Sequence, residues 1–392
     1  MAVLEVNSSN TKNEASGLTT VKQNRGGLEG VVAATTALSK VEGAAGRLIY
    51  RGYSVRDLAH TTTFEEIAHL LWFGHLPNRA ELSDLKARLA AERTLPEVAL
   101  AALRILPPET APMDALRTAI SAWGACAIQN KPTLEQAIAL TARFPLILAA
   151  FYRLRIGLDP LDARPELGNA ANYLYLMHGR MPAEEFVRAL DSYMVMLSDH
   201  GMNASTFTAR VVASTESDMA SAIVAAIGAL KGPLHGGAPS KVLDMLRAIG
   251  TIEQSEEWLR DTITGGGRLM GFGHRIYKTT DPRSEELKEL ARLANSHDLA
   301  LAKHVEERAL ALLDELKPGH EIHTNVEFYS SVVLDAVGLP GDFFTPTFAA
   351  SRIIGWTAHV LEQSANNRLI RPNSDYIGPL QAHFVPIDER SN

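Results

Sequence analysis

Helical spacing of apolar residues dominates the chain between residues 64 and 363. Apolar side chains recur three or four residues apart in one segment after another, which is the period of an α-helix with one buried face. Thr63 and Glu66 have the spacing of a capping box, and Gly74 supplies a C-terminal stop for the helix that follows. Extended segments are scarce, and residues 47–50 are the main candidate strand. The sequence therefore predicts an all-α fold.

The predicted helices follow one another without a fixed repeat length, which argues against a solenoid. They span residues 64–73, 82–89, 113–126, 133–154, 182–197, 217–230, 240–250, 284–294, 297–316, 328–337 and 345–363. Pro182 and Pro346 fit the first turn of their helices, where a missing N–H costs nothing.

Length and composition limit the function classes. A chain of 392 residues can bury a large core and can hold more than one domain. Its net charge of -7, without a long Lys/Arg run, argues against nucleic-acid binding. Cys126 is the only cysteine, which excludes an internal disulfide and a multi-cysteine zinc site. Because we also find neither an 18-residue apolar span nor a signal-peptide core, we expect a cytoplasmic protein that binds no membrane.

Residues 232–238 read Gly-Pro-Leu-His-Gly-Gly-Ala and follow a strongly helical run. Gly232 and Pro233 end that helix, and the two glycines after the histidine let another backbone come close. His235 is thereby left in a glycine-rich break between helices. A lone histidine at a helix end more often caps carbonyls or lies at the surface. The pattern recurs at His200 and His274, however, so we treat all three as candidate catalytic or binding residues.

A glycine-rich stretch with cations follows residue 264. Glycines at 265–267, 271 and 273 precede Arg275, Lys278 and Arg283. Exposed N–H groups beside cations suit phosphates or carboxylates, although the same stretch could be a flexible turn. It matches neither the phosphate-binding loop of nucleotide hydrolases nor the dinucleotide fingerprint.

Two charged residues stand out beside apolar helices. Glu327 precedes an apolar run, where a carboxylate is usually a cap or a dipole partner. Arg352 lies inside an apolar helix, where an unpaired guanidinium is costly, so it needs an anionic partner that is either structural or a substrate. Together with the histidines, this set could deprotonate a carbon acid beside a polyanionic small molecule.

At these residues the chain resembles the citrate synthase family, from Gly27 to Pro372. The motifs that carry the resemblance are Gly27-Leu-Glu-Gly30, Tyr50-Arg-Gly-Tyr53, Pro112-Met-Asp-Ala-Leu-Arg117, Ser198-Asp-His200, Gly232-Pro-Leu-His-Gly-Gly237, Gly273-His274 with Asp281-Pro-Arg283, Gly355-Trp-Thr-Ala-His359 and Arg371-Pro372. Several long motifs in the same order are far more specific than any one of them.

The resemblance implies a cytoplasmic homodimer that condenses acetyl-CoA with oxaloacetate in the tricarboxylic acid cycle and releases citrate. No metal and no tightly bound cofactor are implied, since the coenzyme A thioester is a co-substrate. A large helical domain (residues 27–236 and 338–385) would be interrupted by a smaller mobile one (237–337) on the coenzyme A side. Residues 1–26 and 386–392 would be tails. Closure between the domains would exclude water.

The resemblance also assigns roles to residues. Glu327 would take a methyl proton from acetyl-CoA, His235 would hydrogen-bond the thioester oxygen, and His274 would polarise the keto group of oxaloacetate. The residues implied to hold oxaloacetate are His200, Arg283 and Arg352, with Arg371 supplied by the neighbouring subunit. Those implied to lie along coenzyme A are Leu269, Gly271, Gly273, Lys278 and Asn325.

Glu327 departs from the family, whose usual base is Asp. The side chain is one methylene longer, and a displacement of roughly 1 Å can cost on the order of 100-fold in rate. A compensating backbone shift, a slow enzyme and a different substrate would each fit. We favour compensation, because every other catalytic position is intact. The polar 26-residue tail also differs from the N-terminal domain that some members use for inhibition by NADH.

Three alternatives remain. A 2-methylcitrate synthase would use propionyl-CoA, and one methyl group changes preference by only about 1–3 kcal/mol, which the pattern cannot decide. A catalytically weak scaffold of the same fold has only the glutamate departure in its favour. A metal-dependent hydrolase is disfavoured, because the glycine-flanked histidines lack the spacing of metal ligands. We expect His69, His75, His297 and His304 to be surface or core groups and His359 to be structural.

Overall fold

The computed structural model describes residues 27–28, 30–128, 131–236, 238–273, 277, 279, 281–317, 319 and 322–390. Residues 36–370 form one compact part, and the described residues before 36 and after 370 belong to another. The predicted tail 1–26 lies outside the described residues, as do the last two residues of the predicted tail 386–392.

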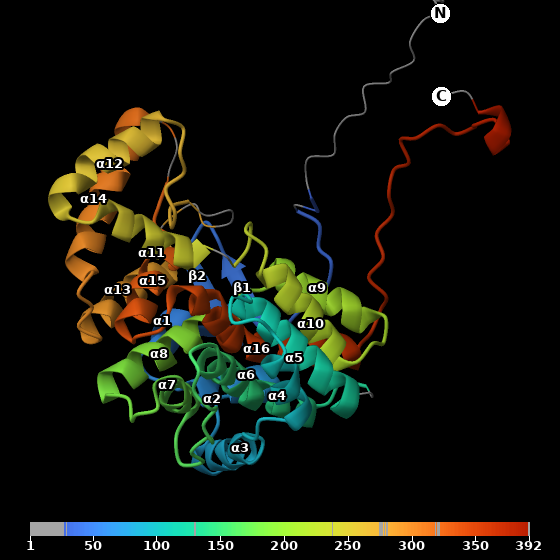
Figure 1. Ribbon diagram of the computed structural model, residues 1–392, viewed down its shortest axis with the longest axis horizontal. Coiled ribbons are helices and arrows are strands. Elements are labelled where there is room, and N and C mark those ends of the chain that lie inside the picture. The colour runs from blue at the N-terminus through green and yellow to red at the C-terminus, as the bar shows by residue number, and fades with distance from the viewer. Residues whose placement is uncertain are drawn as a thin grey trace, which may run out of the picture. The chain divides into compact units, whose positions relative to one another are not determined.

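The chain is mainly helical, which confirms the predicted all-α class (Figure 1). The α-helices are α1 (Val55–Ala59), α2 (Phe64–Phe73), α3 (Arg79–Ala91), α4 (Glu97–Arg104), α5 (Pro112–Ala127), α6 (Leu134–Arg155), α7 (Asn169–His178), α8 (Glu184–Leu197), α9 (Ala204–Ser214), α10 (Met219–Leu230), α11 (Ala238–Ile249), α12 (Ile252–Thr264), α13 (Pro282–Leu293), α14 (Leu299–Leu316), α15 (Val326–Ala336) and α16 (Phe344–Ala365). Two 3-10 helices, η1 (Gly341–Phe343) and η2 (Ile387–Glu389), complete the set.

Local sequence signals explain several helix ends. Thr63 and Glu66 form the predicted capping box of α2, and Gly74 closes that helix with φ 91°. Pro182 was predicted in the first turn of α8, but this is wrong, because α8 begins at Glu184. The proline instead lies in the loop that leads into the helix.

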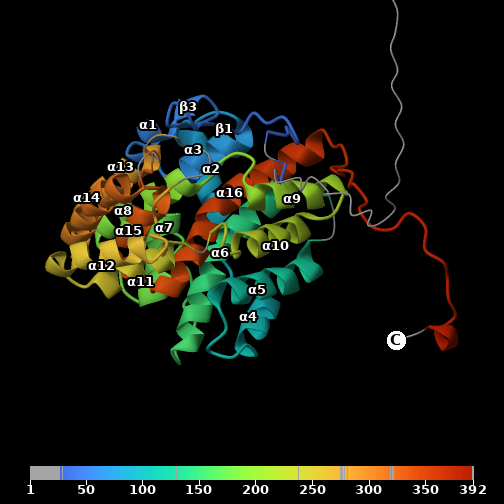
Figure 2. The same ribbon diagram turned by 90° about the horizontal axis from the view of Figure 1, so that it is seen from above.

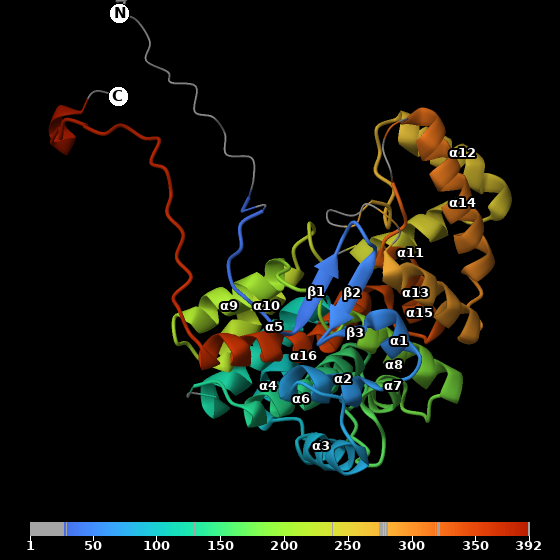
Figure 3. The same cartoon turned by 180° about the vertical axis from the view of Figure 1, so that it is seen from behind.

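A small antiparallel sheet packs on the helices (Figure 3). It consists of β1 (Ser39–Glu42), β2 (Arg47–Tyr50) and β3 (Tyr53–Ser54). Tyr50 ends β2, is fully buried, and pairs with Tyr53 across the turn. Its hydroxyl donates to the carbonyl of Asp199 at 2.8 Å and accepts the N–H of Asp199 at 3.1 Å. The sheet therefore anchors the backbone just beyond α8.

Helices α11 to α15 lie together at one end of the part formed by residues 36–370 (Figures 1 and 2). α12 packs on α14, and α15 packs on both α11 and α13. These helices fall in the range expected for the small domain, 237–337, and α13 and α15 also contact α8. The division into domains 27–236 with 338–385 and 237–337 stays a prediction.

The 22-residue helix α6 is long and apolar enough to cross a membrane by length and composition alone, since an 18-residue window has a mean hydropathy of 1.5. However, 78% of that window is buried inside the protein. The prediction that the chain holds no 18-residue apolar span is therefore wrong, but this span is a helix of the protein core.

Helix α16 runs through the core and packs against α6, α8, α9 and α10. Nearly all of its side chains up to Val360 are buried. Gly355 is the point of closest approach, because a Cβ there would lie 2.2 Å from the carbonyl oxygen of Ser198. The glycine lets α16 touch the chain that leads to His200.

We expect Gly355→Ala to destabilise the protein by about 1–3 kcal/mol, because the added methyl group forces α16 away from Ser198. Urea unfolding measures the change. Ser351→Ala is the matched control, one turn earlier and equally buried, since its hydroxyl bonds only to the carbonyl of Thr347. Equal stability of the two variants would contradict the close approach at Gly355.

Candidate active site

His235 lies in the tight loop after α10. The backbone N–H of His235 donates to the carbonyl of Gly232 at 2.9 Å, and the backbone N–H of Gly236 donates to the carbonyl of Leu230 at 3.0 Å. A Cβ on Gly236 would lie 2.6 Å from a Leu230 methyl and 2.7 Å from its carbonyl oxygen, so this position requires glycine, as predicted. Gly237 lies outside the described residues. Thr345 ties the loop to α16 by donating to the carbonyl of Gly236 at 2.8 Å.

The tautomer of His235 follows from its neighbours. The backbone N–H of Ser205 points at Nε2 from 3.3 Å, and a main-chain N–H can only donate. Nε2 is therefore the unprotonated nitrogen, and the Ser205 hydroxyl, 2.9 Å away, can donate to it as well. Trp356 completes the chain by donating Nε1–H to the Ser205 hydroxyl oxygen at 3.1 Å. The imidazole proton lies on Nδ1.

Burial also keeps His235 neutral. Removal from water, together with the positive charge of Arg352, lowers the pKa of His235 to about 4. At neutral pH this residue is consequently a neutral hydrogen-bond donor through Nδ1.

Glu327 occupies the second position of α15. The Asn325 side chain caps this helix by accepting the N–H of Glu327 at 2.9 Å. Burial raises the pKa of Glu327 to about 7, with Arg283 opposing the rise and Asp281 adding to it. A carboxyl with such a pKa can both accept and release a proton near neutral pH.

The glycine loop pairs with the segment that precedes α15. Phe272 and Thr324 form an isolated antiparallel β-bridge. On either side of it, the N–H of Gly273 donates to the carbonyl of His323 at 2.8 Å, and the N–H of Asn325 donates to the carbonyl of Gly271 at 2.9 Å. Gly271 has φ 82°, and a Cβ there would lie 2.8 Å from that of Phe328. Only glycine fits this position.

Further expected coenzyme residues lie around this loop. Asn325 also donates its side-chain N–H to the carbonyl of Gly273 at 2.9 Å, and Leu269 is half-buried before the loop. His274 and Lys278 lie outside the described residues.

Arg283 is buried in a two-point ion pair. Its Nε lies 3.0 Å from one carboxylate oxygen of Asp281 and its Nη2 lies 2.8 Å from the other. Burial disfavours the charge, but Asp281 outweighs this and raises the pKa of Arg283. Asp281 also caps α13 and accepts the N–H of Val326 at 3.3 Å, so one carboxylate fixes the starts of α13 and α15.

Arg352 is 1% exposed and makes no ion pair with any described residue. Its Nε donates to the carbonyl of Leu197 at 2.6 Å, and the guanidinium lies over the ring of Phe348 at 4.7 Å. Burial lowers the pKa of Arg352 to about 10, although Asp199 opposes this. The sequence predicts that Arg352 has an anionic partner, which is either a protein group or a substrate. No described carboxylate forms an ion pair with Arg352, which favours a substrate.

His200 is buried, with Nε2 3.2 Å from the hydroxyl of Tyr277. The preceding residue, Asp199, lies 3.3 Å from Nε2 of His359 and accepts the N–H of Gly201 at 3.2 Å. Burial opposes ionisation of Asp199, but His359 and Arg352 hold its pKa below the ordinary value. This buried network supports the backbone at His200 and agrees with a structural role for His359.

The described site residues influence one another electrostatically. Arg352 acts on His235, Asp199 and Arg283, and Arg283 acts on Glu327. His235 thus lies in the field of Arg352, and Glu327 lies in the field of Arg283. Arg371 is exposed and belongs to the part after residue 370, which we describe separately.

Sequence reasoning missed Tyr193, Tyr277 and Ser205. Tyr277 contacts His200, and Ser205 contacts His235. The side chain of Tyr193 is fully buried near Arg352, Arg283 and Glu327. In the sequence these residues are marked only by being near a candidate site residue. Ser205 follows His200 by five positions, and Tyr193 precedes it by seven.

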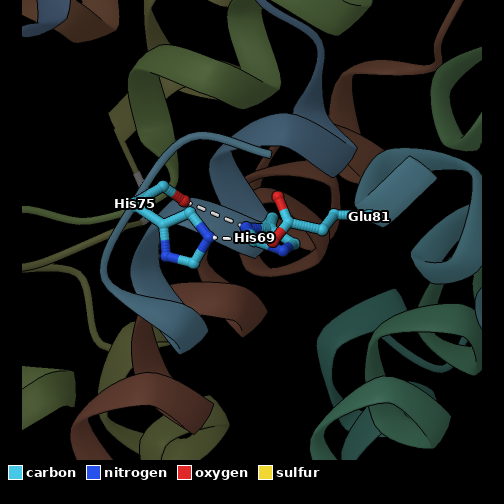
Figure 4. Close-up of side chains that lie close together, drawn as sticks. All are labelled: His69, His75 and Glu81. Atoms are coloured by element: carbon cyan, nitrogen blue, oxygen red, sulfur yellow. Dashed lines mark hydrogen bonds and ion pairs between the residues drawn. The ribbon is translucent and has the colours of Figure 1, made fainter. Parts of the chain in front are cut away.

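His69, His75 and Glu81 form a separate cluster with side chains of the types that bind metals (Figure 4). His69 is buried and donates Nδ1–H to the carbonyl of His75 at 2.9 Å, while Nε2 of the exposed His75 lies 3.2 Å from Glu81. Glu81 also closes the capping box of α3 with Asn78. These bonds explain the cluster as a tie across the α2–α3 loop.

An all-α fold that buries two guanidiniums and half-buries a carboxyl and a neutral imidazole is typical of an enzyme acting on a small anion. The sequence model described as citrate synthase, C-terminal domain, matches residues 27–373. The chain belongs to the citrate synthase family, whose members are acyl-transferring enzymes.

Individual relatives agree over nearly the whole chain. Citrate synthase 2 of Bacillus subtilis is 44% identical over 93% of this chain and 99% of its own. The 2-methylcitrate synthase of Shewanella oneidensis is 38% identical over 93% and 97%. A citrate synthase from Thermoplasma acidophilum, solved as a ternary complex with carboxymethyl coenzyme A and oxaloacetate, superimposes with a TM-score of 0.87 at 34% identity over 93% and 98%.

Glu327 should make stability depend on pH. Its pKa rises from 4.5 to about 7 on folding, so the folded state keeps a proton that the unfolded chain has lost. The stabilisation is fully present below pH 4.5 and is lost as pH rises through 7, by up to about 3 kcal/mol at 1.36 kcal/mol per pH unit. Relative to the wild type, Glu327→Gln should therefore gain stability between pH 5 and pH 8.

Urea unfolding at the two pH values measures this difference. The control is Glu257→Gln, at an exposed carboxyl on α12, which should follow the wild type at both. A constant difference between the wild type and Glu327→Gln would refute the raised pKa.

Proposed function

We propose that this protein condenses acetyl-CoA with oxaloacetate and hydrolyses the citryl-CoA intermediate to citrate and CoA. Membership of the citrate synthase family supports the proposal, as do the names of its relatives. The observation that carries it is the half-buried carboxyl of Glu327, whose pKa of about 7 suits a base that works near neutral pH.

In this proposal Glu327 removes a proton from the methyl group of acetyl-CoA. The Nδ1–H of His235 donates to the thioester oxygen as the enolate forms, so negative charge develops beside a preorganised donor. The methyl carbon then attacks the keto carbon of oxaloacetate, whose oxygen His274 polarises. Water finally cleaves the thioester and releases CoA, which makes the sequence irreversible.

Oxaloacetate would be held by His200, Arg283 and Arg352. The strongest support is the charge of Arg352, which is buried without an ion pair among the described residues and would gain one from a carboxylate. Arg283 is already paired with Asp281, so it would share its remaining N–H groups with the second carboxylate. Arg371 would come from a neighbouring subunit.

Coenzyme A would lie along the glycine loop. The main chain of Leu269, Gly271 and Gly273, the side chain of Asn325 and the cation of Lys278 would contact it. Pairing of this loop with residues 323–325 supports the proposal, because it links the coenzyme site to the start of the helix that carries Glu327.

The proposal includes a cytoplasmic homodimer with shared sites and closure of the domain 237–337 over the substrates. Supporting the dimer, the described C-terminal segment exposes large apolar side chains that a second subunit could cover, namely Tyr376, Ile377, Leu380 and Phe384. The single cysteine supports a reducing compartment.

A 2-methylcitrate synthase is the second candidate, because the Shewanella oneidensis relative bears that name at 38% identity. Thiol release with oxaloacetate separates the two functions by comparing kcat/KM for acetyl-CoA and propionyl-CoA. We expect acetyl-CoA to be preferred. Preference for propionyl-CoA would establish the second function, and release with neither would support the catalytically weak scaffold.

Replacing Glu327 by Gln should lower kcat for thiol release by at least about 100-fold, because an amide cannot take the methyl proton. Calorimetry should still detect oxaloacetate binding with little change in affinity. Glu65→Gln is the control, since Glu65 is a buried carboxylate that accepts the N–H of Asn169 in the remote α2–α7 contact, whereas Glu327 is half-buried. Near-normal turnover of Glu327→Gln would remove Glu327 as the base.

A further inference from the structure

Tyr193 has a hydroxyl that is buried without a partner. Its side chain is 0% exposed, and its oxygen makes no hydrogen bond to any described residue. An unpaired polar group inside a protein loses its bonds to water and gains nothing in exchange. Such a group in a native structure needs an explanation, and a missing ligand is one.

The position of Tyr193 on α8 places it at the site. α8 packs against α13, α15 and α16, which carry Arg283, Glu327 and Arg352 respectively. Tyr193 and Leu197 are four residues apart and therefore share one face of the helix. Arg352 bonds to the carbonyl of Leu197 at 2.6 Å, so it lies at the C-terminal end of α8, one turn beyond Tyr193.

The charges around Tyr193 define what it can bind. Burial raises the pKa of Tyr193, so the phenol keeps its proton and acts as a donor, although Arg352 and Arg283 oppose the rise. Guanidinium groups only donate hydrogen bonds and cannot accept this proton. The acceptor must therefore come from outside these groups, and two neighbouring cations favour an anion there.

We propose that the Tyr193 hydroxyl donates a hydrogen bond to a carboxylate of the substrate held between Arg283 and Arg352. The inference rests on the proposed binding of oxaloacetate and adds a specificity-determining residue to it. Tyr193 offers a fixed neutral donor beside two cations, which favours a carboxylate over a neutral group.

Calorimetry with oxaloacetate alone tests the inference on Tyr193→Phe. A hydrogen bond to a charged acceptor is worth enough that we expect affinity to fall about 10-fold to 100-fold. In turnover, KM for oxaloacetate should rise by a similar factor, whereas KM for acetyl-CoA and kcat should change little. The unliganded variant should melt at the wild-type temperature or above it, because only an unpaired hydroxyl has been removed.

Tyr173→Phe is the matched control. Tyr173 is also fully buried, but its hydroxyl lies 3.0 Å from that of Thr347. Since Thr347 donates its own proton to the carbonyl of Phe343, Tyr173 is the donor in this pair. Tyr173→Phe should thus lower the melting temperature without altering the affinity for oxaloacetate.

Three results would overturn the inference. The affinity of Tyr193→Phe for oxaloacetate could match that of the wild type, or the unliganded variant could lose stability as Tyr173→Phe does. Alternatively, affinity could stay constant while the pH dependence of turnover shifts, which would make Glu327 the acceptor. Absence of turnover and of oxaloacetate binding in the wild type would instead count against the proposed function itself.

Discussion

The buried charge of Arg352 is the constraint on which the rest of the site depends. A guanidinium in the middle of a core helix is costly unless something compensates its charge. The Leu197 carbonyl, the Phe348 ring and the field of Asp199 compensate in part, yet burial still lowers the pKa of Arg352 to about 10. The fold thus keeps a region of positive potential at the end of α8. An anion beside Arg352 would complete the pairing, which a neutral molecule would not do.

Arg352 and Arg283 lie beside the two acid–base groups of the site, His235 and Glu327, whose pKa values shift in opposite directions. Because Asp281 neutralises Arg283 through two hydrogen bonds, Glu327 beside it meets only weak opposition to desolvation, and its pKa rises to about 7. Burial lowers the pKa of His235 to about 4, and the positive charge of Arg352 adds to this effect. Burial is the main cause of both shifts, since it disfavours the charged form of each group, and the two cations modify it, so the site holds a carboxyl that exchanges protons at neutral pH and an imidazole that remains neutral. Groups with pKa values pushed apart in this way are suited to separate roles as base and hydrogen-bond donor.

The parts of the molecule that could be predicted from sequence are those with strong local signals. Residues 133–154 were predicted as a helix, and α6 spans Leu134–Arg155, because Thr133 caps a long apolar run. Helices α1, α4, α7, α9 and α12 were not predicted; they lack the long apolar run that marks α6, and tertiary packing stabilises them. Among site residues, His235 and Arg352 each break a local rule and could be identified. Tyr193 could not, since an aromatic residue on an apolar face is usually core, and only its tertiary surroundings reveal the unpartnered hydroxyl.

The glutamate at position 327 can be reconsidered against the way its helix is held. Asn325 caps α15 and reaches back to Gly273, while Asp281 binds the N–H of Val326 and ties the helix start to α13. The side chains of Asn325 and Asp281 consequently fix the main chain at residue 327. They would do so equally for an aspartate or a glutamate at that position. A side chain that is one methylene longer has to be accommodated elsewhere, because the cap leaves no freedom to retract it. We therefore expect the compensation in the separation between α15 and the His235 loop, which belong to different segments of the fold and can be spaced independently.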